Sequence, residues 1–148
     1  MKTNNNILIA QGGGPTNVIN QSLAGIIINE KKMGSKIFGS LNGVNGIINN
    51  RFLDLNKISN SDLKIIQNTP GAALGSTRDK PDQNYCIEIF KRLQTKNIKK
   101  FYYIGGNDSS DSLKIISNFA ESKNYGLQCI HVPKTIDNDL VLNDHTTG

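Results

Sequence analysis

The sequence has little cysteine and histidine, and this scarcity narrows the chemistry available to it. Only two cysteines, Cys86 and Cys129, occur among 148 residues, far apart and in apolar surroundings. They are typical of reduced, buried thiols rather than of a disulfide framework. The two histidines, His131 and His145, have no metal-ligand spacing with the cysteines, which argues against a zinc site.

Long apolar runs are also missing. No stretch approaches the roughly 20 apolar residues that a membrane-spanning helix needs. Near the N-terminus, Lys2 is followed by only a short apolar run at residues 7–10, which is far shorter than the apolar core of a signal peptide. We therefore expect a cytoplasmic protein without a membrane partner.

Positive charge is in excess but scattered. The formal net charge is +5 and the pI is about 9.3. No stripe of Lys and Arg with interleaved aromatic residues occurs, so the basic residues indicate solvated faces and helix ends more than a polyanion-binding patch. A nucleic-acid partner is not expected.

Strand-like and helix-like segments alternate along the chain. Apolar runs typical of strands cover residues 7–10, 37–40, 101–104 and 127–132, and helical patterns cover residues 18–32, 61–67, 84–96 and 109–122. The Gly- and Asn-rich segment 43–50 is interpreted as a loop or a loop with a short turn, and 70–81 as a long loop. Such alternation predicts an α/β fold with a three-layer, doubly wound, mostly parallel sheet of the Rossmann-like kind.

Finer features of the helices can also be predicted. Ser59 or Ser61 is a suitable N-cap for the helix at 61–67. The spacing of Ile87, Phe90 and Leu93 predicts that these three side chains face inward from the helix at 84–96. The length of the chain allows one core of ordinary domain size, which we take as a single domain over residues 1–148.

Three motifs follow predicted strands. They are Gly12–Asn17 after the first strand, Gly105–Ser109 after the third and Pro133–Asp139 after the fourth. Ligands of doubly wound sheets bind beyond the carboxyl ends of the strands, so the three motifs are expected at one site.

The last of these motifs has the composition of a phosphoryl-transfer centre. Asp137 and Asp139 lie two residues apart, beside Lys134 and Thr135. One carboxylate can take a proton from an attacking hydroxyl, the other can hold a metal or orient its neighbour, and the lysine can neutralise phosphoryl charge. The alternative is a purely structural Asx-turn at Asn138.

The other two motifs and a loop arginine are less specific. Gly12–Gly14 can expose backbone N–H groups to a phosphate or can be an ordinary tight turn, and it matches neither common phosphate-loop pattern. Arg78, in a Gly- and Ser-containing loop, suits a clamp on phosphate oxygens but could be a plain surface residue. Asp108 or Ser109 could serve as the N-cap of the following helix.

With these motifs the chain resembles the phosphofructokinase family, most closely its pyrophosphate-dependent branch. The resemblance runs from about residue 6 to residue 148 and covers only the first part of such an enzyme. It implies the donor-binding and catalytic N-terminal domain of that fold, which we expect to be truncated, from an enzyme that works as a homo-oligomer.

The resemblance also implies roles for individual residues. Asp137 is the general base toward the sugar hydroxyl, Thr135 contacts the sugar phosphate, and Ile136 lies between them in the substrate-binding run. Asp139 assists catalysis through Mg²⁺ or proton handling. The donor-binding residues are Gly13, Arg78, Asp108 and Ser109, and Asn20 is a further match to the family.

Two differences from the ATP-dependent members of the family indicate pyrophosphate as the phosphoryl donor. Asp108 and Lys134 each stand where ATP-dependent members carry glycine. The Asp108 carboxylate would fill the space that the ATP α-phosphate needs and would repel that phosphate. Lys134 can pair with pyrophosphate in the transition state. Asn107 replaces the aspartate that holds Mg²⁺ in the family, and its amide oxygen can ligate the metal without adding charge.

The expected reaction is therefore transfer of a phosphoryl group from pyrophosphate to the 1-hydroxyl of fructose 6-phosphate, giving fructose 1,6-bisphosphate in a reversible glycolytic step. The alternatives are an ATP-dependent 6-phosphofructokinase and an inactive fragment or non-catalytic subunit. A kinase of the NAD kinase group is disfavoured by the run from Thr135 to Asp139. Since the family completes its sugar-phosphate site with later residues and a neighbouring subunit, little turnover is expected from these 148 residues alone.

Overall fold

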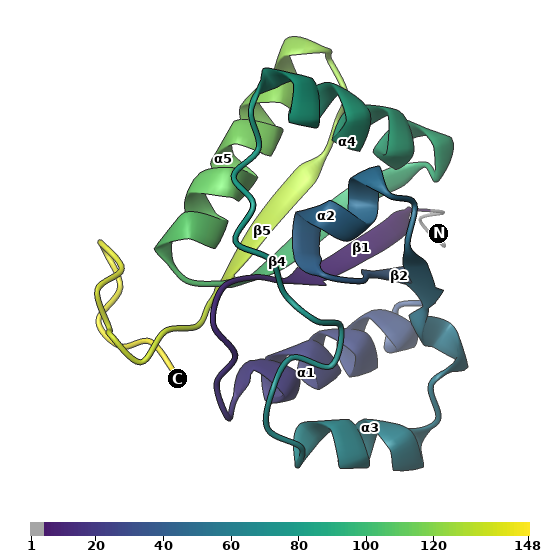
Figure 1. The fold of residues 1–148 in the computed structure, drawn as a ribbon. Coiled ribbons are helices and arrows are strands. Elements are labelled where there is room, and N and C mark those ends of the chain that lie inside the picture. The colour runs from purple at the N-terminus through teal and green to yellow at the C-terminus, as the bar shows by residue number, and fades with distance from the viewer. Residues whose placement is uncertain (1–4) are drawn as a thin grey trace.

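A computed structural model describes residues 5–148 as a five-stranded sheet with helices on both faces (Figure 1). The elements in chain order are β1 (Asn6–Gln11), α1 (Ile19–Lys32), β2 (Lys36–Ser40), α2 (Gly43–Ile48), β3 (Phe52–Asp54), a 3-10 helix (Leu55–Lys57), α3 (Asn60–Gln67), α4 (Gln83–Thr95), β4 (Ile98–Gly105), α5 (Asn107–Ser122) and β5 (Gln128–Pro133).

The strand order is β3-β2-β1-β4-β5, and every pairing is parallel except β2 with β3. The chain builds outward from β1 to β2 and then returns to add β4 and β5 on the other side of β1. The topological switch point therefore lies between β1 and β4, where doubly wound sheets bind ligands. The predicted fold class is confirmed.

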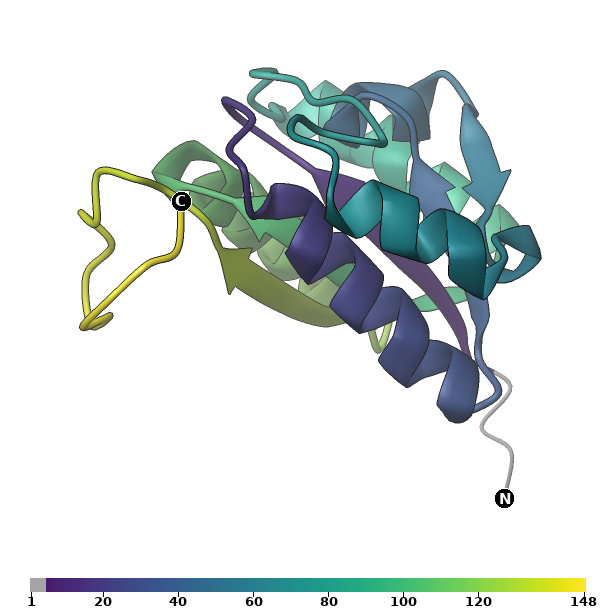
Figure 2. The ribbon, with the colours of Figure 1, turned by 90° about the horizontal axis from the view of Figure 1, so that it is seen from below.

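Both faces of the sheet are covered, which makes three layers. Helices α2, α4 and α5 pack on one face, and α1 and α3 on the other, which is the layer nearest the viewer in Figure 2. Successive residues of β1 alternate between the two cores, with Leu8 and Ala10 in one and Ile7 and Ile9 in the other. This double burial explains why the strands are almost continuously apolar.

The interpretation of residues 43–50 as a loop was wrong, because most of this segment forms α2. Val44 and Ile47 are fully buried in the core with α4 and α5. Gly46 is required by packing, since a Cβ there would overlap the backbone carbonyl of Leu41. Tertiary packing thus overrides the low helix propensity of Gly and Asn.

Three further features differ from, or refine, the sequence expectations. The three-residue strand β3 was missed, being too short to give a periodic signal. On α4 the buried side chains are Cys86, Ile89 and Leu93, whereas Ile87 is 38% exposed and does not face inward. Ser59 is confirmed as the N-cap of α3, with its hydroxyl accepting the Asp62 amide N–H.

Both cysteines are free thiols within the described part of the chain; Cys86 is buried as expected, whereas Cys129 is only half-buried, and burial raises the pKa of each. In residues 5–148 no helix combines the length and apolarity that crossing a membrane would require.

A buried carboxylate joins α1 to β4. Glu30 at the end of α1 accepts hydrogen bonds from Tyr102 Oη (2.6 Å), Lys100 Nζ (3.0 Å) and Ser35 Oγ (3.0 Å). Burial alone would raise its pKa, but these hydrogen bonds and the Lys100 charge outweigh burial and lower the pKa below the ordinary 4.5. The ionised form therefore stabilises the fold.

We predict that Glu30→Gln destabilises the chain by about 1–3 kcal/mol, because three half-buried donors lose a charged acceptor. Because the folded-state pKa is lowered, the wild-type advantage should hold at neutral pH and fade as the pH falls below 4.5. Urea unfolding from pH 7 to pH 3 measures this. Glu88→Gln, at an exposed pair with Lys91, is the matched control and should change little. Equal effects of the two substitutions would contradict the assignment.

Candidate functional site

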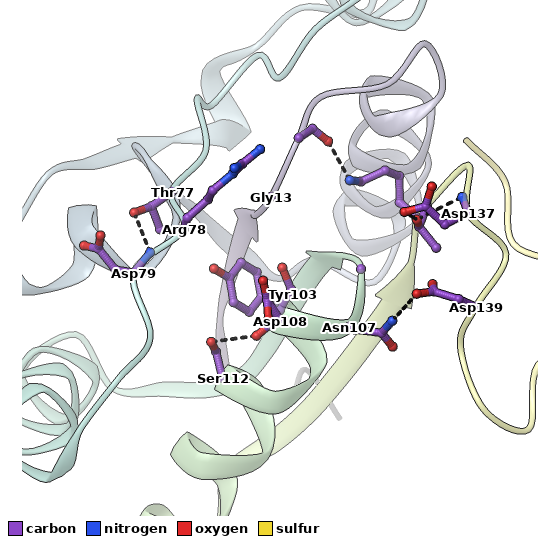
Figure 3. Close-up of a pocket in the computed structure, with 15 residues that line it drawn as sticks. Gly13, Thr77, Arg78, Asp79, Tyr103, Asn107, Asp108, Ser112, Asp137 and Asp139 are labelled. Atoms are coloured by element: carbon purple, nitrogen blue, oxygen red, sulfur yellow. Dashed lines mark hydrogen bonds between the residues drawn. The ribbon is translucent and has the colours of Figure 1, made fainter.

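The three predicted motifs lie together at one edge of the sheet. Because β1, β4 and β5 are adjacent and parallel, the turns that follow them are neighbours, and a cavity of about 300 Å³ opens between these turns and the loop before α4 (Figure 3). Its lining consists of Gly13, Gly14, Thr77, Arg78, Asp79, Tyr103, Gly106, Asn107, Asp108, Ser109, Ser112, Lys134, Thr135, Asp137 and Asp139.

Most residues singled out from the sequence line this cavity. Two of them do not: Ile136, which is 80% exposed, and Asn20, which is buried behind the cavity wall. Sequence reasoning missed Thr77, Asp79, Tyr103 and Ser112. Proximity to Arg78 was the only signal available for the two loop residues, and Tyr103 is indistinguishable from an ordinary strand residue in sequence.

The turn after β1 is held in place by backbone hydrogen bonds. The Gly12 N–H donates to the Ile104 carbonyl (2.8 Å), and the Gly13 N–H donates to the Thr77 carbonyl (3.2 Å). The Gly13 amide, which was expected to face a phosphate, is therefore already paired. Gly13 has a left-handed φ of +73°, and its lack of a side chain leaves the space beside Lys134 Nζ open.

Lys134 is a buried cation at the end of β5. Its Nζ donates to the Gly14 carbonyl (2.6 Å), and its backbone N–H donates to the Gly105 carbonyl (3.0 Å). Burial lowers the pKa of the ammonium, an effect partly opposed by the charge of Asp137. The lysine is thus fixed at both its backbone and its side chain while lining the cavity.

Arg78 extends from the opposite loop toward the turn after β1, as Figure 3 shows. Among residues 5–148 its guanidinium has no ion-pair partner. An exposed guanidinium that lines the same cavity as the buried Lys134 can bind phosphate oxygens in a planar, bidentate manner.

The loop that carries Arg78 is anchored by a buried polar pair. Gln11 Oε1 accepts the Leu74 N–H (2.8 Å), and Asn20 Oδ1 accepts the Ala73 N–H (2.8 Å). Asn20 Nδ2 also donates to the Thr69 carbonyl (2.8 Å), and the two side chains bond each other. Asn20, noted from the sequence without a role, is therefore a loop anchor.

Asp79 fastens the same loop to α2 and α4. Its carboxylate accepts hydrogen bonds from Asn45 Nδ2 (3.0 Å) and Tyr85 Oη (2.8 Å). These two bonds, the Asn45 bond above all, lower the pKa of Asp79. Asp79 therefore stays ionised, and its carboxylate ties the loop to α2 and α4.

The amino end of α5 faces the cavity. The N-cap is Gly106, so Asp108 and Ser109 lie within the first turn, and the alternative that one of them caps the helix is excluded. First-turn N–H groups have no partner within a helix and carry partial positive charge, which favours an anion here. The Asp108 carboxylate forms an ion pair with Lys80 (2.9 Å).

In the acidic segment after β5, Asn138 has a structural role, whereas Asp137 and Asp139 are exposed. Asn138 has a left-handed φ of +49°, and its Oδ1 accepts the Thr146 N–H (2.7 Å), so it closes the loop. Asp137 and Asp139 remain exposed at the cavity (Figure 3). The Thr135 hydroxyl accepts the Asp137 N–H (3.2 Å) and orients that residue.

The donor set suits a hard cation bound together with phosphate. Within residues 5–148 no group of three or more His, Cys, Asp or Glu side chains forms a metal cluster. Asn107 Nδ2 donates to Asp139 Oδ2 (2.7 Å), which leaves Asn107 Oδ1 and the other Asp139 oxygen for a ligand. Mg²⁺ is commonly held by one or two carboxylates plus phosphate oxygens and water, so these residues fit it.

Comparison with known proteins gives the family. A protein-family model described as phosphofructokinase matches residues 6–148. The pyrophosphate–fructose 6-phosphate 1-phosphotransferase of Rhodospirillum rubrum is 53% identical over 144 residues, which cover 96% of the chain and 36% of that relative. The chain thus spans about a third of the length of this relative.

A solved structure and a second relative extend the comparison. The pyrophosphate-dependent phosphofructokinase of Nitrosospira multiformis superimposes with a TM-score of 0.89 at 34% identity, over 93% of this chain and 35% of that one. An ATP-dependent 6-phosphofructokinase of Haemophilus influenzae is 30% identical over 96% of the chain and 42% of the relative.

We predict that Asn20→Ala releases the loop that carries Arg78. The substitution leaves the Ala73 N–H and the Thr69 carbonyl without their side-chain partner, and the Gln11 amide keeps only its hydrogen bond to the Ile19 carbonyl, at a cost of about 1–3 kcal/mol. Hydrogen exchange at Ala73 and Leu74 should accelerate well beyond any global change. Asn118→Ala, at an exposed position of α5, is the control, and unchanged exchange in the Asn20 variant would contradict the anchoring role.

Proposed function

The chain belongs to the phosphofructokinase family, and we propose that its cavity is the donor side of an active site that transfers a phosphoryl group from pyrophosphate to the 1-hydroxyl of fructose 6-phosphate. On this proposal residues 1–148 are the donor-binding and catalytic N-terminal domain. The observation that carries it is the convergence of Lys134, Arg78 and the amino end of α5 on one cavity with Asp137 at its rim.

The donor is held by cations and by backbone dipoles. Lys134 and Arg78 bind the oxygens of the transferred phosphoryl group, and the first-turn N–H groups of α5 add positive potential. Gly13 and Ser109 complete the wall. Because Lys134 is already fixed to the Gly14 carbonyl, little side-chain ordering is needed when the donor binds.

Asp137 takes the proton. The sugar 1-hydroxyl oxygen attacks the terminal phosphorus of pyrophosphate, its proton passes to the Asp137 carboxylate, and the bridging P–O bond breaks to release phosphate. Thr135 orients Asp137 and contacts the sugar phosphate. Ile136, which projects into solvent, meets the acceptor from outside the cavity.

Magnesium would be held by Asp139 and the amide oxygen of Asn107. When bound, it neutralises phosphate charge, which this site needs because carboxylates outnumber cations in its lining. Asp139 also helps to keep the Asn107 amide in place beside the amino end of α5.

Asp108 selects the donor. Its carboxylate lies in the first turn of α5 at the cavity, where a third phosphate group would meet like charge and filled volume. The greater identity to the pyrophosphate-dependent relative supports this choice over ATP. We further place the protein in glycolysis, in the cytoplasm and in a homo-oligomer.

The donor assay tests the proposal. The protein is purified at the length at which its source cell makes it and is assayed with fructose 6-phosphate and Mg²⁺. We expect turnover with pyrophosphate at least tenfold above that with ATP, and little turnover by these 148 residues alone. Equal or faster turnover with ATP would support the ATP-dependent alternative instead.

We predict that Asp137→Asn lowers kcat by about 10²–10⁴-fold, because it removes the general base. Pyrophosphate affinity should stay within a few-fold of wild type, since Asp137 acts on the acceptor. Asp144→Asn, an exposed carboxylate in the same C-terminal loop, is the control and should retain full activity. Substantial activity in the Asp137 variant would exclude its role as the base.

We predict that pyrophosphate affinity decreases as the pH is raised, and that the decrease begins at a lower pH than it would with a solvent-exposed lysine. Because burial lowers the pKa of Lys134, its ammonium loses the proton, and with it the attraction for phosphate, below pH 10.5. Lys134→Met should weaken binding by about tenfold or more and abolish this alkaline dependence. Calorimetric titration from pH 7 to pH 10 measures both, with the exposed Lys114→Met as control.

A further inference from the structure

A second lysine belongs to the donor site although it does not line the cavity. Lys80 Nζ lies 2.9 Å from Asp108 Oδ1, with side-chain exposures of 66% and 65%. The pair joins the loop that carries Arg78 to the first turn of α5. We propose that Lys80 is a donor-specificity residue, which offsets part of the charge of Asp108 so that Asp108 can exclude a longer phosphate chain while repelling pyrophosphate less. The inference rests on the proposed function.

The pair is held at both ends by ordered structure. Next to Lys80, Asp79 is fastened by Asn45 and Tyr85, and the Thr77 carbonyl accepts the Gly13 amide. Asp108 belongs to a 16-residue helix. The backbone segments that carry Lys80 and Asp108 are therefore both fixed next to the cavity.

The Lys80–Asp108 ion pair contributes little to the stability of the fold. Exposed ion pairs add little to stability because water and salt screen them. At the cavity the same charges matter more, since Asp108 is one of four carboxylates in a lining that holds only two cationic side chains, Arg78 and Lys134. An uncompensated Asp108 would repel any phosphate a few ångströms away.

The surroundings of Lys80 support the assignment. Its pKa is raised, chiefly by the hydrogen bond to Asp108 and by that residue's charge, with a smaller contribution from Asp111. The ammonium is therefore charged throughout the physiological range and faces carboxylates rather than the open cavity. Lys80 acts on the donor through Asp108.

A double-mutant cycle tests this relay. The probe is magnesium pyrophosphate, titrated calorimetrically into wild type, Lys80→Met, Asp108→Asn and the double variant. Lys80→Met should raise the Kd about fivefold when Asp108 is present, and less than about twofold in the Asp108→Asn background. The fivefold effect should shrink as salt is raised from 0.05 to 0.5 M.

The remaining outcomes separate the possible failures. An equal effect of Lys80→Met in both backgrounds would mean that Lys80 binds pyrophosphate directly, and no effect in either would mean that it has no role; each overturns the inference. No pyrophosphate binding by wild type would overturn the proposed function as well. Lys91→Met, which breaks the comparable exposed pair with Glu88 on α4, is the matched control and should leave the Kd unchanged.

Discussion

The parallel pairing of β4 between β1 and β5 is the constraint on which the site depends. The register matches Gln11 with Ile104 and Gly105 with Pro133, so the three strands end at the same level. Hydrogen bonds from Gly12 to Ile104 and from Lys134 to Gly105 continue the ladder into the turns. A side chain at Gly12 would overlap Tyr103 and Ser109, so this close approach requires glycine.

The two sides of the site differ in how firmly they are built. On the side that we propose for the donor, Gln11, Asn20 and Asp79 hold the Arg78 loop from within, and Lys134 is buried. On the side that we propose for the acceptor, Asp137 lies in an exposed segment held mainly by short-range hydrogen bonds. Under the proposed function, a preorganised donor site would lower the barrier to phosphoryl transfer, and an open acceptor side would leave room for the groups that bind a sugar phosphate.

The sequence predicted the fold class and most of the cavity lining because unbroken apolar strands and strand-end motifs are local signals. It missed α2, whose helix forms because Val44 and Ile47 pack in the core and Gly46 fits against Leu41, and these are tertiary effects. It also could not show that the Gly13 amide is already paired or that Lys80 meets Asp108, since both contacts join segments distant in sequence. The roles given to the site residues stay predictions.

A crystal structure of the protein with magnesium pyrophosphate would show whether the cavity binds the donor. We expect density for pyrophosphate in the cavity, within hydrogen-bond distance of Lys134 Nζ and the Arg78 guanidinium and facing the amino end of α5, with the Lys80–Asp108 pair intact beside it. Pyrophosphate bound elsewhere, or a cavity that stays free of it at saturating concentration, would rule out the proposed donor site.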